Sequence, residues 1–175
     1  MVVDPLATAP TAPSAAPAFQ RWLPWFISAA LITLSADLVS KQVLFALPGD
    51  TAFPAYIRRD SNPGVAWSLF RDHPWFVVVL TGLLIPVLGW VWWKHYRLTG
   101  AWDNLAFGCI LGGALGNAVD RVLTRCGELA GVRDFIFVDL GFPPFDPWPT
   151  FNLADSGICI GFAILVLRSF RSAKT

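Results

Sequence analysis

The sequence has 175 residues, which is enough for one domain, and 55% of them are hydrophobic while only 14% are charged. With a mean hydropathy of +0.54, this composition excludes an ordinary soluble domain and makes the lipid bilayer the expected solvent. The net charge of +1 offers no basic footprint for nucleic acid, so DNA and RNA are not expected partners.

The chain begins with residues 1–20, which are rich in Ala and Pro and carry one charge, Asp4. Such a segment buries too little apolar surface to offset chain entropy, so we expect a flexible tail before a single membrane domain at residues 21–175. A first membrane helix is predicted at about residues 22–45. Its charge-free start is compatible with a signal peptide, but the polar residues 37–41 continue the helical register and favour an uncleaved span.

Three further apolar runs predict helices at about residues 74–94, 103–123 and 151–169. The run at 74–93 has no charge, and at about 1.5 Å per residue it covers a hydrocarbon core of roughly 30 Å. Residues 47–72 mix Pro, Gly, aromatic and β-forming residues, and the β-forming runs at 53–57 and 64–70 suggest strands. The sequence therefore predicts an all-α membrane protein, a four-transmembrane-helix antiparallel bundle with a small extracytoplasmic β-rich platform between helices one and two.

Basic residues predict the orientation of this bundle. One side carries Arg21, Lys94, Arg97, Arg168, Arg171 and Lys174 in short flanks. Short basic flanks are typically cytoplasmic, so both termini are expected in the cytoplasm. The opposite side also carries arginines, at positions 58, 59, 71, 125 and 133, but these are spread over two longer loops.

Polar residues gather where helix one ends, helix three ends and helix four begins, and an antiparallel bundle brings these three ends to one membrane face. They are Asp37, Lys41, Asn117, Asp120, Arg121, Asn152 and Asp155. Ionisable groups inside a span are costly and usually face the bundle interior or a water-filled cavity. The cluster is therefore a candidate functional site.

Each polar residue also has a structural interpretation. Asp37 and Lys41 are spaced i, i+4, which favours an intrahelical ion pair. Asp120 is expected to tie its helix to another element. For Asn117 and Arg121, substrate contact and helix packing are both open alternatives.

Asp155 lies about four residues, roughly 6 Å, past Phe151 and should be submerged near the interface, which favours a functional role. Asp134, Asp139 and Asp146 are its possible partners, and spacing alone does not choose among them.

Two carboxylates that share a site cannot both ionise easily, so one keeps a proton while the other activates water, as in aspartic peptidases. The sequence contains neither HExxH nor GxSxG, and its histidines, His73 and His95, fall at opposite ends of helix two. A proton-coupled transporter using Asp155 and Asp120 is an alternative, although the carboxylates stop near one face. A structural adaptor or an inactive homologue is another.

Five motifs, in order along the chain, resemble those of the lipoprotein signal peptidase family, also called signal peptidase II. They are residues 37–41 (DLVSK), 62–68 (NPGVAWS), 112–121 (GGALGNAVDR), 132–135 (VRDF) and 151–155 (FNLAD). The corresponding family patterns are D-x-x-S/T-K, N-x-G-x-A-aromatic, G-G-x-x-G-N-x-x-D-R, V-x-D-F and F-N-x-A-D. One such motif alone would be weak, but five in order on a four-span chain are specific.

The resemblance implies that Asp134 and Asp155 form the catalytic dyad. It implies that the substrate-binding or supporting positions are Asn62, Gly64, Asn117, Asp120, Arg121, Asn152 and Ala154. Asp37 and Lys41 keep their interpretation as a structural pair. The departures are a longer loop at 122–133, a Pro-rich loop at 141–150 and a tail at 1–20 without a counterpart.

The implied activity is that of an aspartic endopeptidase at the membrane surface. It would remove the signal peptide from diacylglyceryl-modified prolipoproteins by cleaving just before the lipid-modified cysteine. The expected partners are this precursor and membrane lipid, with no metal or organic cofactor, and the enzyme is expected to be a monomer. The expected location is the bacterial cytoplasmic (inner) membrane, with the active site near the extracytoplasmic face.

Overall fold

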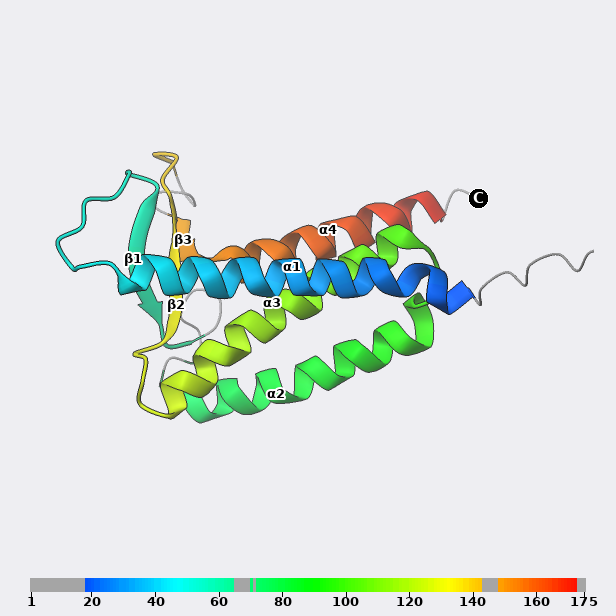
Figure 1. The fold of residues 1–175 in the computed structure, drawn as a ribbon, viewed down its shortest axis with the longest axis horizontal. Coiled ribbons are helices and arrows are strands. Elements are labelled where there is room, and N and C mark those ends of the chain that lie inside the picture. Colours follow the sequence, from blue (N-terminus) through cyan, green and yellow to red (C-terminus); the bar gives the residue numbers. More distant parts are fainter. Residues whose placement is uncertain (1–17, 65–69, 71, 143–147, 173–175) are drawn as a thin grey trace, which may run out of the picture.

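The computed structural model describes residues 18–64, 70, 72–142 and 148–172. Figure 1 shows their long helices side by side, with a small sheet at one end of the bundle. The elements are α1 (Ala18–Ala46), β1 (Ile57–Asn62), α2 (Pro74–Val91), the π-helical turn η2 (Trp92–Tyr96), α3 (Ala101–Arg125), β2 (Val132–Val138), β3 (Trp148–Phe151) and α4 (Leu153–Ser172). Within the described residues, four helices are long and apolar enough to cross a membrane. The predicted four-helix membrane bundle is confirmed.

Helix α3 is the central helix of the bundle. It packs against α1, α2 and α4 and is the most buried of the four. Glycines allow these close approaches: a Cβ added to Gly112 would lie 2.4 Å from the Ala30 carbonyl oxygen of α1, and one on Gly113 would lie 2.3 Å from the Ala154 carbonyl oxygen of α4. Helices in lipid associate largely through such packing of small residues.

The glycine contact between α3 and α4 gives a stability prediction. Gly113→Ala should lower the unfolding midpoint in detergent. The new methyl group must push the α4 backbone away, which lowers the free energy of unfolding by about 1–3 kcal/mol. Gly82→Ala in α2 is the matched control, since a Cβ there meets nothing within 4 Å. An equal midpoint for the two variants would contradict the packing argument.

The small predicted sheet is present, with three antiparallel strands in the order β1-β2-β3. Its register places Asp60 opposite Asp134 and Ile136 opposite Phe151. Only β1 comes from the segment between the first two helices, because β2 and β3 follow α3. Residues 53–56, predicted as part of a strand, form loop and turn, and most of the predicted strand at 64–70 lies outside the described residues. Asp134 therefore lies in the central strand.

Arg59 joins the sheet to the end of α1. Its guanidinium donates to the carbonyl oxygens of Leu47 at 2.7 Å and Pro48 at 2.9 Å. The last carbonyls of a helix and those just after it have no intrahelical partner, so a side-chain donor there satisfies groups that would otherwise need water. This contact ties β1 to the end of α1.

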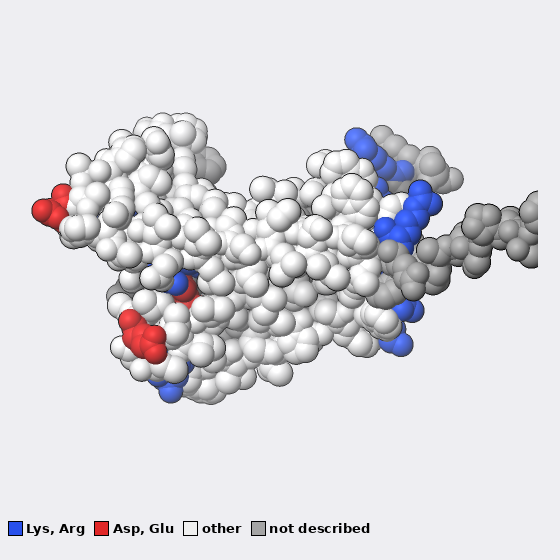
Figure 2. All heavy atoms as spheres, viewed as in Figure 1, with Lys and Arg blue, Asp and Glu red and all other residues white. Residues whose placement is uncertain are grey.

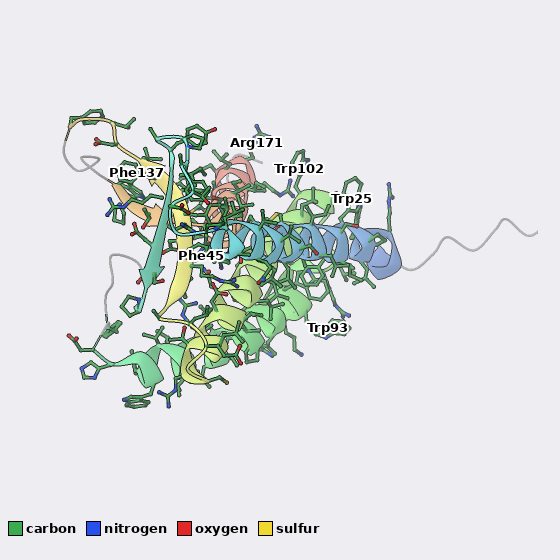
Figure 3. All side chains as sticks on the ribbon, turned by 60° about the vertical axis from the view of Figure 1, so that its left-hand side comes forward. Trp25, Phe45, Trp93, Trp102, Phe137 and Arg171 are labelled. Atoms are coloured by element: carbon green, nitrogen blue, oxygen red, sulfur yellow. The ribbon has the colours of Figure 1, made fainter. Side chains whose placement is uncertain are left out.

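The other end of the bundle has an aromatic and basic character. Figure 3 shows Trp25, Trp93 and Trp102 toward this end, and all three are exposed. Figure 2 shows Lys and Arg side chains gathered there, while the middle of this face carries no charged atoms. Indole rings favour membrane–water interfaces, so this end marks one edge of the span.

Candidate active site

Helix α4 begins with a reciprocal cap that fixes Asp155. The Asp155 backbone N–H donates to Asn152 Oδ1 at 3.0 Å, and the Asn152 backbone N–H donates to Asp155 Oδ2 at 3.3 Å. This is the pattern of a capping box, with Asn at the N-cap and Asp three residues later. The carboxylate of Asp155 is thereby held over the first turn of the helix.

A second amide holds the other oxygen of the same carboxylate. Asn117 of α3 donates from Nδ2 to Asp155 Oδ1 at 2.7 Å. Asn152 Nδ2 in turn donates to Asp134 Oδ1 at 2.6 Å and to Asn117 Oδ1 at 3.0 Å. Asn152 therefore contacts both carboxylates, and Asp134 and Asp155 lie on either side of one residue.

Asp134 is in an environment that favours its protonated form. Asp134 is 1% exposed. Its burial is the larger cause, and the charge of Asp155 the second, that raises the pKa of Asp134 to about 7. Hydrogen bonds from Asn152 and Asn62 act in the opposite direction. Asn62 is itself oriented by the Gly64 backbone N–H, which donates to its Oδ1 at 3.0 Å. Near neutral pH, Asp134 therefore exchanges its proton readily.

The two carboxylates line a cavity of about 470 Å³. Asn62 and Arg121 also line it, and its apolar walls come from β3 and α4, including Trp148, Phe151 and Ile158. Polar groups on one side of an apolar cavity are typical of a binding site that orients its ligand.

Behind the cavity lies a buried ion cluster, which we define as Asp37, Lys41, Asp120 and Arg133. Lys41 Nζ lies 2.7 Å from Asp37 Oδ2 and 3.3 Å from Asp120 Oδ2, and all three side chains are fully buried. Lys41 also donates to Asn117 Oδ1 at 3.0 Å, and the Ala154 backbone N–H donates to Asp37 Oδ1 at 2.9 Å. The cluster thus joins α1, α3 and the start of α4 directly beside the two carboxylates.

Comparison with known families identifies the protein class. A model of signal peptidase (SPase) II matches residues 29–171. The chain belongs to the signal peptidase II family. Members of this family are peptidases, and together with the four apolar helices this makes the chain a multi-pass membrane peptidase of a bacterial family.

Individual relatives agree with the family match. The chain is 36% identical over 180 residues to the lipoprotein signal peptidase of Mycobacterium tuberculosis strain H37Rv, covering 95% of this chain and 83% of the relative. It is 42% identical over 120 residues to that of Beijerinckia indica, covering 66% and 65%. A solved bacterial membrane enzyme superposes with a TM-score of 0.72 at 26% identity, covering 87% of this chain and 91% of that one.

Sequence reasoning missed one residue of the candidate site, Arg133. Its Nη2 lies 2.7 Å from Asp120 Oδ1, and its backbone N–H donates to Asp120 Oδ2 at 2.9 Å. Arg133 was interpreted only as a charge in a loop. The signal that could have found it is its place directly before Asp134 in an apolar strand, where alternate side chains point to opposite faces. Asp120 holds β2, and thus Asp134, against α3.

The structure brings the remaining predicted positions together around the cavity or behind it. Gly64 and Ala154 are buried, and Arg121 lies on the cavity with a buried Nε. The rival carboxylate Asp139 is exposed and accepts a hydrogen bond from the Gly141 backbone N–H at 2.9 Å. The other rival, Asp146, lies outside the described residues, as do the motif residues 65–68.

Proposed function

We propose that this chain is an aspartic endopeptidase that removes the signal peptide from diacylglyceryl-modified prolipoproteins, cleaving just before the lipid-modified cysteine. Asp134 and Asp155 are its catalytic dyad. The observation that carries this proposal is the position of Asn152 between two carboxylates that line one cavity. Its side-chain amide donates to Asp134 and its backbone N–H donates to the carboxylate of Asp155. All of these groups come from one chain, so a monomer, the state we propose, contains the complete site.

The proposed mechanism gives the two carboxylates different tasks. Asp155, which accepts hydrogen bonds from Asn117 and Asn152, is the base and takes a proton from the attacking water. Asp134, whose raised pKa favours its protonated form, donates to the scissile carbonyl oxygen. The tetrahedral diol then returns that proton to Asp134 as the C–N bond breaks, and Asp155 protonates the leaving cysteine amine. The products are the signal-peptide carboxylate and the free amine of the lipidated protein.

The surroundings of the dyad support a substrate that stays partly in lipid. The apolar wall at Phe151 and Ile158 can accept the hydrophobic end of a signal helix. We assign Asn62, Gly64 and Arg121 to the substrate side of the site, and Asn117, Asp120, Asn152 and Ala154 to its support. Asp37 and Lys41 anchor that support from α1.

The charge distribution supports the proposed orientation. Arg21, Lys94, Arg97 and the two arginines of α4 lie at the end away from the sheet, which we place in the cytoplasm (Figure 2). The dyad then lies near the extracytoplasmic face of a bacterial cytoplasmic membrane, where lipid-modified precursors keep their acyl chains in the bilayer.

The test of this function is direct. Purified protein in lipid nanodiscs is incubated with a diacylglyceryl-modified prolipoprotein, and mass spectrometry identifies the new N-terminus. We expect cleavage immediately before the modified cysteine. The matched control is the same precursor without the diacylglyceryl group, which should be cleaved at least about tenfold more slowly because remote binding energy is lost. Cleavage at another bond, or none, would reject the proposal.

The raised pKa of Asp134 predicts the pH dependence of the reaction. Because its protonated form is needed, kcat/KM should fall as pH rises above about 7, by about tenfold per unit at the limit. Loss of the ionised base causes a second fall on the acid side, so the profile should be bell-shaped and report the values of the coupled pair. A rate that rises steadily to pH 9 would point to a different acid.

A further inference from the structure

A second cavity lies at the end of the bundle away from the sheet. It has a volume of about 300 Å³ and is lined by Trp102 of α3 and by four residues of α4, namely Ile164, Leu167, Arg168 and Arg171. The α4 residues fall at positions i, i+3, i+4 and i+7, which share one face of the helix. The cavity is therefore apolar toward the middle of the span and basic toward its edge.

The two arginines of this cavity differ in their availability. Arg168 is engaged by Asp103, with Nε at 2.5 Å and Nη2 at 3.0 Å from the two carboxylate oxygens. Arg171 is exposed and has no ion-pair partner among residues 18–64, 70, 72–142 and 148–172. Asp103, next to Trp102 in α3, is thus already paired with Arg168, and within the described residues Arg171 leaves a positive charge without an ion-pair partner.

The remaining lining residues match the depth profile of a lipid. Trp102 is 60% exposed and Leu167 is 63% exposed, both on the surface that faces the bilayer. Figure 3 shows Trp102 and Arg171 at the same end of the molecule. An indole ring prefers the headgroup level of a membrane, whereas an aliphatic side chain below it prefers acyl chains. The order along α4, from Ile164 through Leu167 to Arg171, runs from acyl to headgroup depth.

We propose that this cavity binds the headgroup of an anionic phospholipid. Arg171 contacts the phosphate, because a guanidinium donates well-oriented hydrogen bonds to phosphate oxygens. The cavity, of about 300 Å³, has room for a glycerophosphate headgroup at its basic end. The acyl chains extend from there along Ile164 and Leu167. Basic pockets at a membrane edge are typical sites for such headgroups.

The proposal is tested by native mass spectrometry of the full chain in detergent. The protein is mixed with equal amounts of phosphatidylglycerol and phosphatidylcholine that have identical acyl chains. Wild type should retain one phosphatidylglycerol in preference to phosphatidylcholine. Arg171→Gln should weaken that binding about fivefold, the effect of one basic residue near a membrane surface.

Lys94→Gln is the matched control, because it makes the same charge change at the same end, at an exposed residue of η2 that does not line the cavity. It should keep wild-type binding. Equal losses in both variants would show general electrostatic attraction and overturn the site, as would equal retention of the two lipids. Displacement of phosphatidylglycerol by millimolar inorganic phosphate would show a free-anion site and also overturn it. Trp102→Ala should weaken lipid binding as well, and wild-type binding there would contradict the cavity.

Discussion

Asp155→Asn is expected to lower kcat/KM for prolipoprotein cleavage by about 10³-fold or more, and Asp134→Asn by a similar factor. An amide cannot take a proton from water or donate one to the scissile carbonyl, and positioned acid–base groups commonly contribute 10²–10⁴-fold each. Rates are measured as release of the signal peptide by mass spectrometry under kcat/KM conditions. The amide keeps the size of the carboxylate, so the cavity should keep its shape.

Asp139→Asn is the matched control for this pair, since Asp139 lies five residues after Asp134, is exposed and does not line the cavity. It should retain full activity. The dyad assignment fails if Asp139→Asn loses activity or if either dyad variant keeps it.

Stability separates loss of chemistry from loss of folding in the dyad variants. Burial raises the pKa of Asp134 to about 7, above its value of about 3.9 in an unfolded chain. The native state therefore favours the protonated acid, and stability is lost as pH rises toward about 7. Asparagine never ionises, so Asp134→Asn should unfold at a higher temperature than wild type at pH 8. A lower midpoint at that pH would show that the variant disturbs the fold.

Lys41→Met is expected to destabilise the protein by about 3–5 kcal/mol, the typical cost of removing one partner from a buried ion pair. Lys41 is fully buried between Asp37 and Asp120, and Asp120 keeps Arg133 while Asp37 loses its cation. Because Asp37 also holds the Ala154 backbone N–H at the start of α4, activity should fall with stability. The measurement is the unfolding midpoint in detergent together with the cleavage rate.

Two further variants show whether the unpaired charge causes the Lys41 effect. Lys94→Met removes an exposed lysine and should leave the midpoint unchanged within about 0.5 kcal/mol. The double variant Asp37→Leu with Lys41→Met removes both buried charges and should recover part of the lost stability. If the double variant is as unstable as the sum of its single variants, the charge explanation is wrong.

The sequence predicts the helices well because each must supply a long apolar surface to lipid. The uncharged run at 74–93 identifies α2, and α1 and α3 extend up to four residues beyond their predicted ranges. Helix α4 begins two residues after its predicted start at 151, because Phe151 belongs to β3, and it ends three residues later than predicted. The π-helical turn η2 has no comparable signature. The sequence also places the polar helix ends at one face, since antiparallel connection alone requires it.

The sheet and the second carboxylate are harder to predict, for a physical reason. A short strand in a loop reveals its alternation but not its partner, so pairing of Asp60 with Asp134 is not visible beforehand. Spacing alone does not distinguish Asp134 from Asp139 or Asp146 as the partner of Asp155. Only the family motif favours Asp134. The ion pair of Arg133 with Asp120 is hidden for a similar reason, because it forms only once β2 packs against α3.

Asn152 gives the site a property that a titratable linker would lack. Its amide has no proton to lose across the working pH range, yet it contacts Asp134 at 2.6 Å and forms the reciprocal cap with Asp155. The residue that links the two carboxylates therefore does not itself titrate. Asn152 lowers the pKa of Asp134 through its hydrogen bond, whereas burial and the charge of Asp155 raise it. A change in the solvent exposure of Asp134 would thus retune the acidity of the enzyme while the link through Asn152 stays in place.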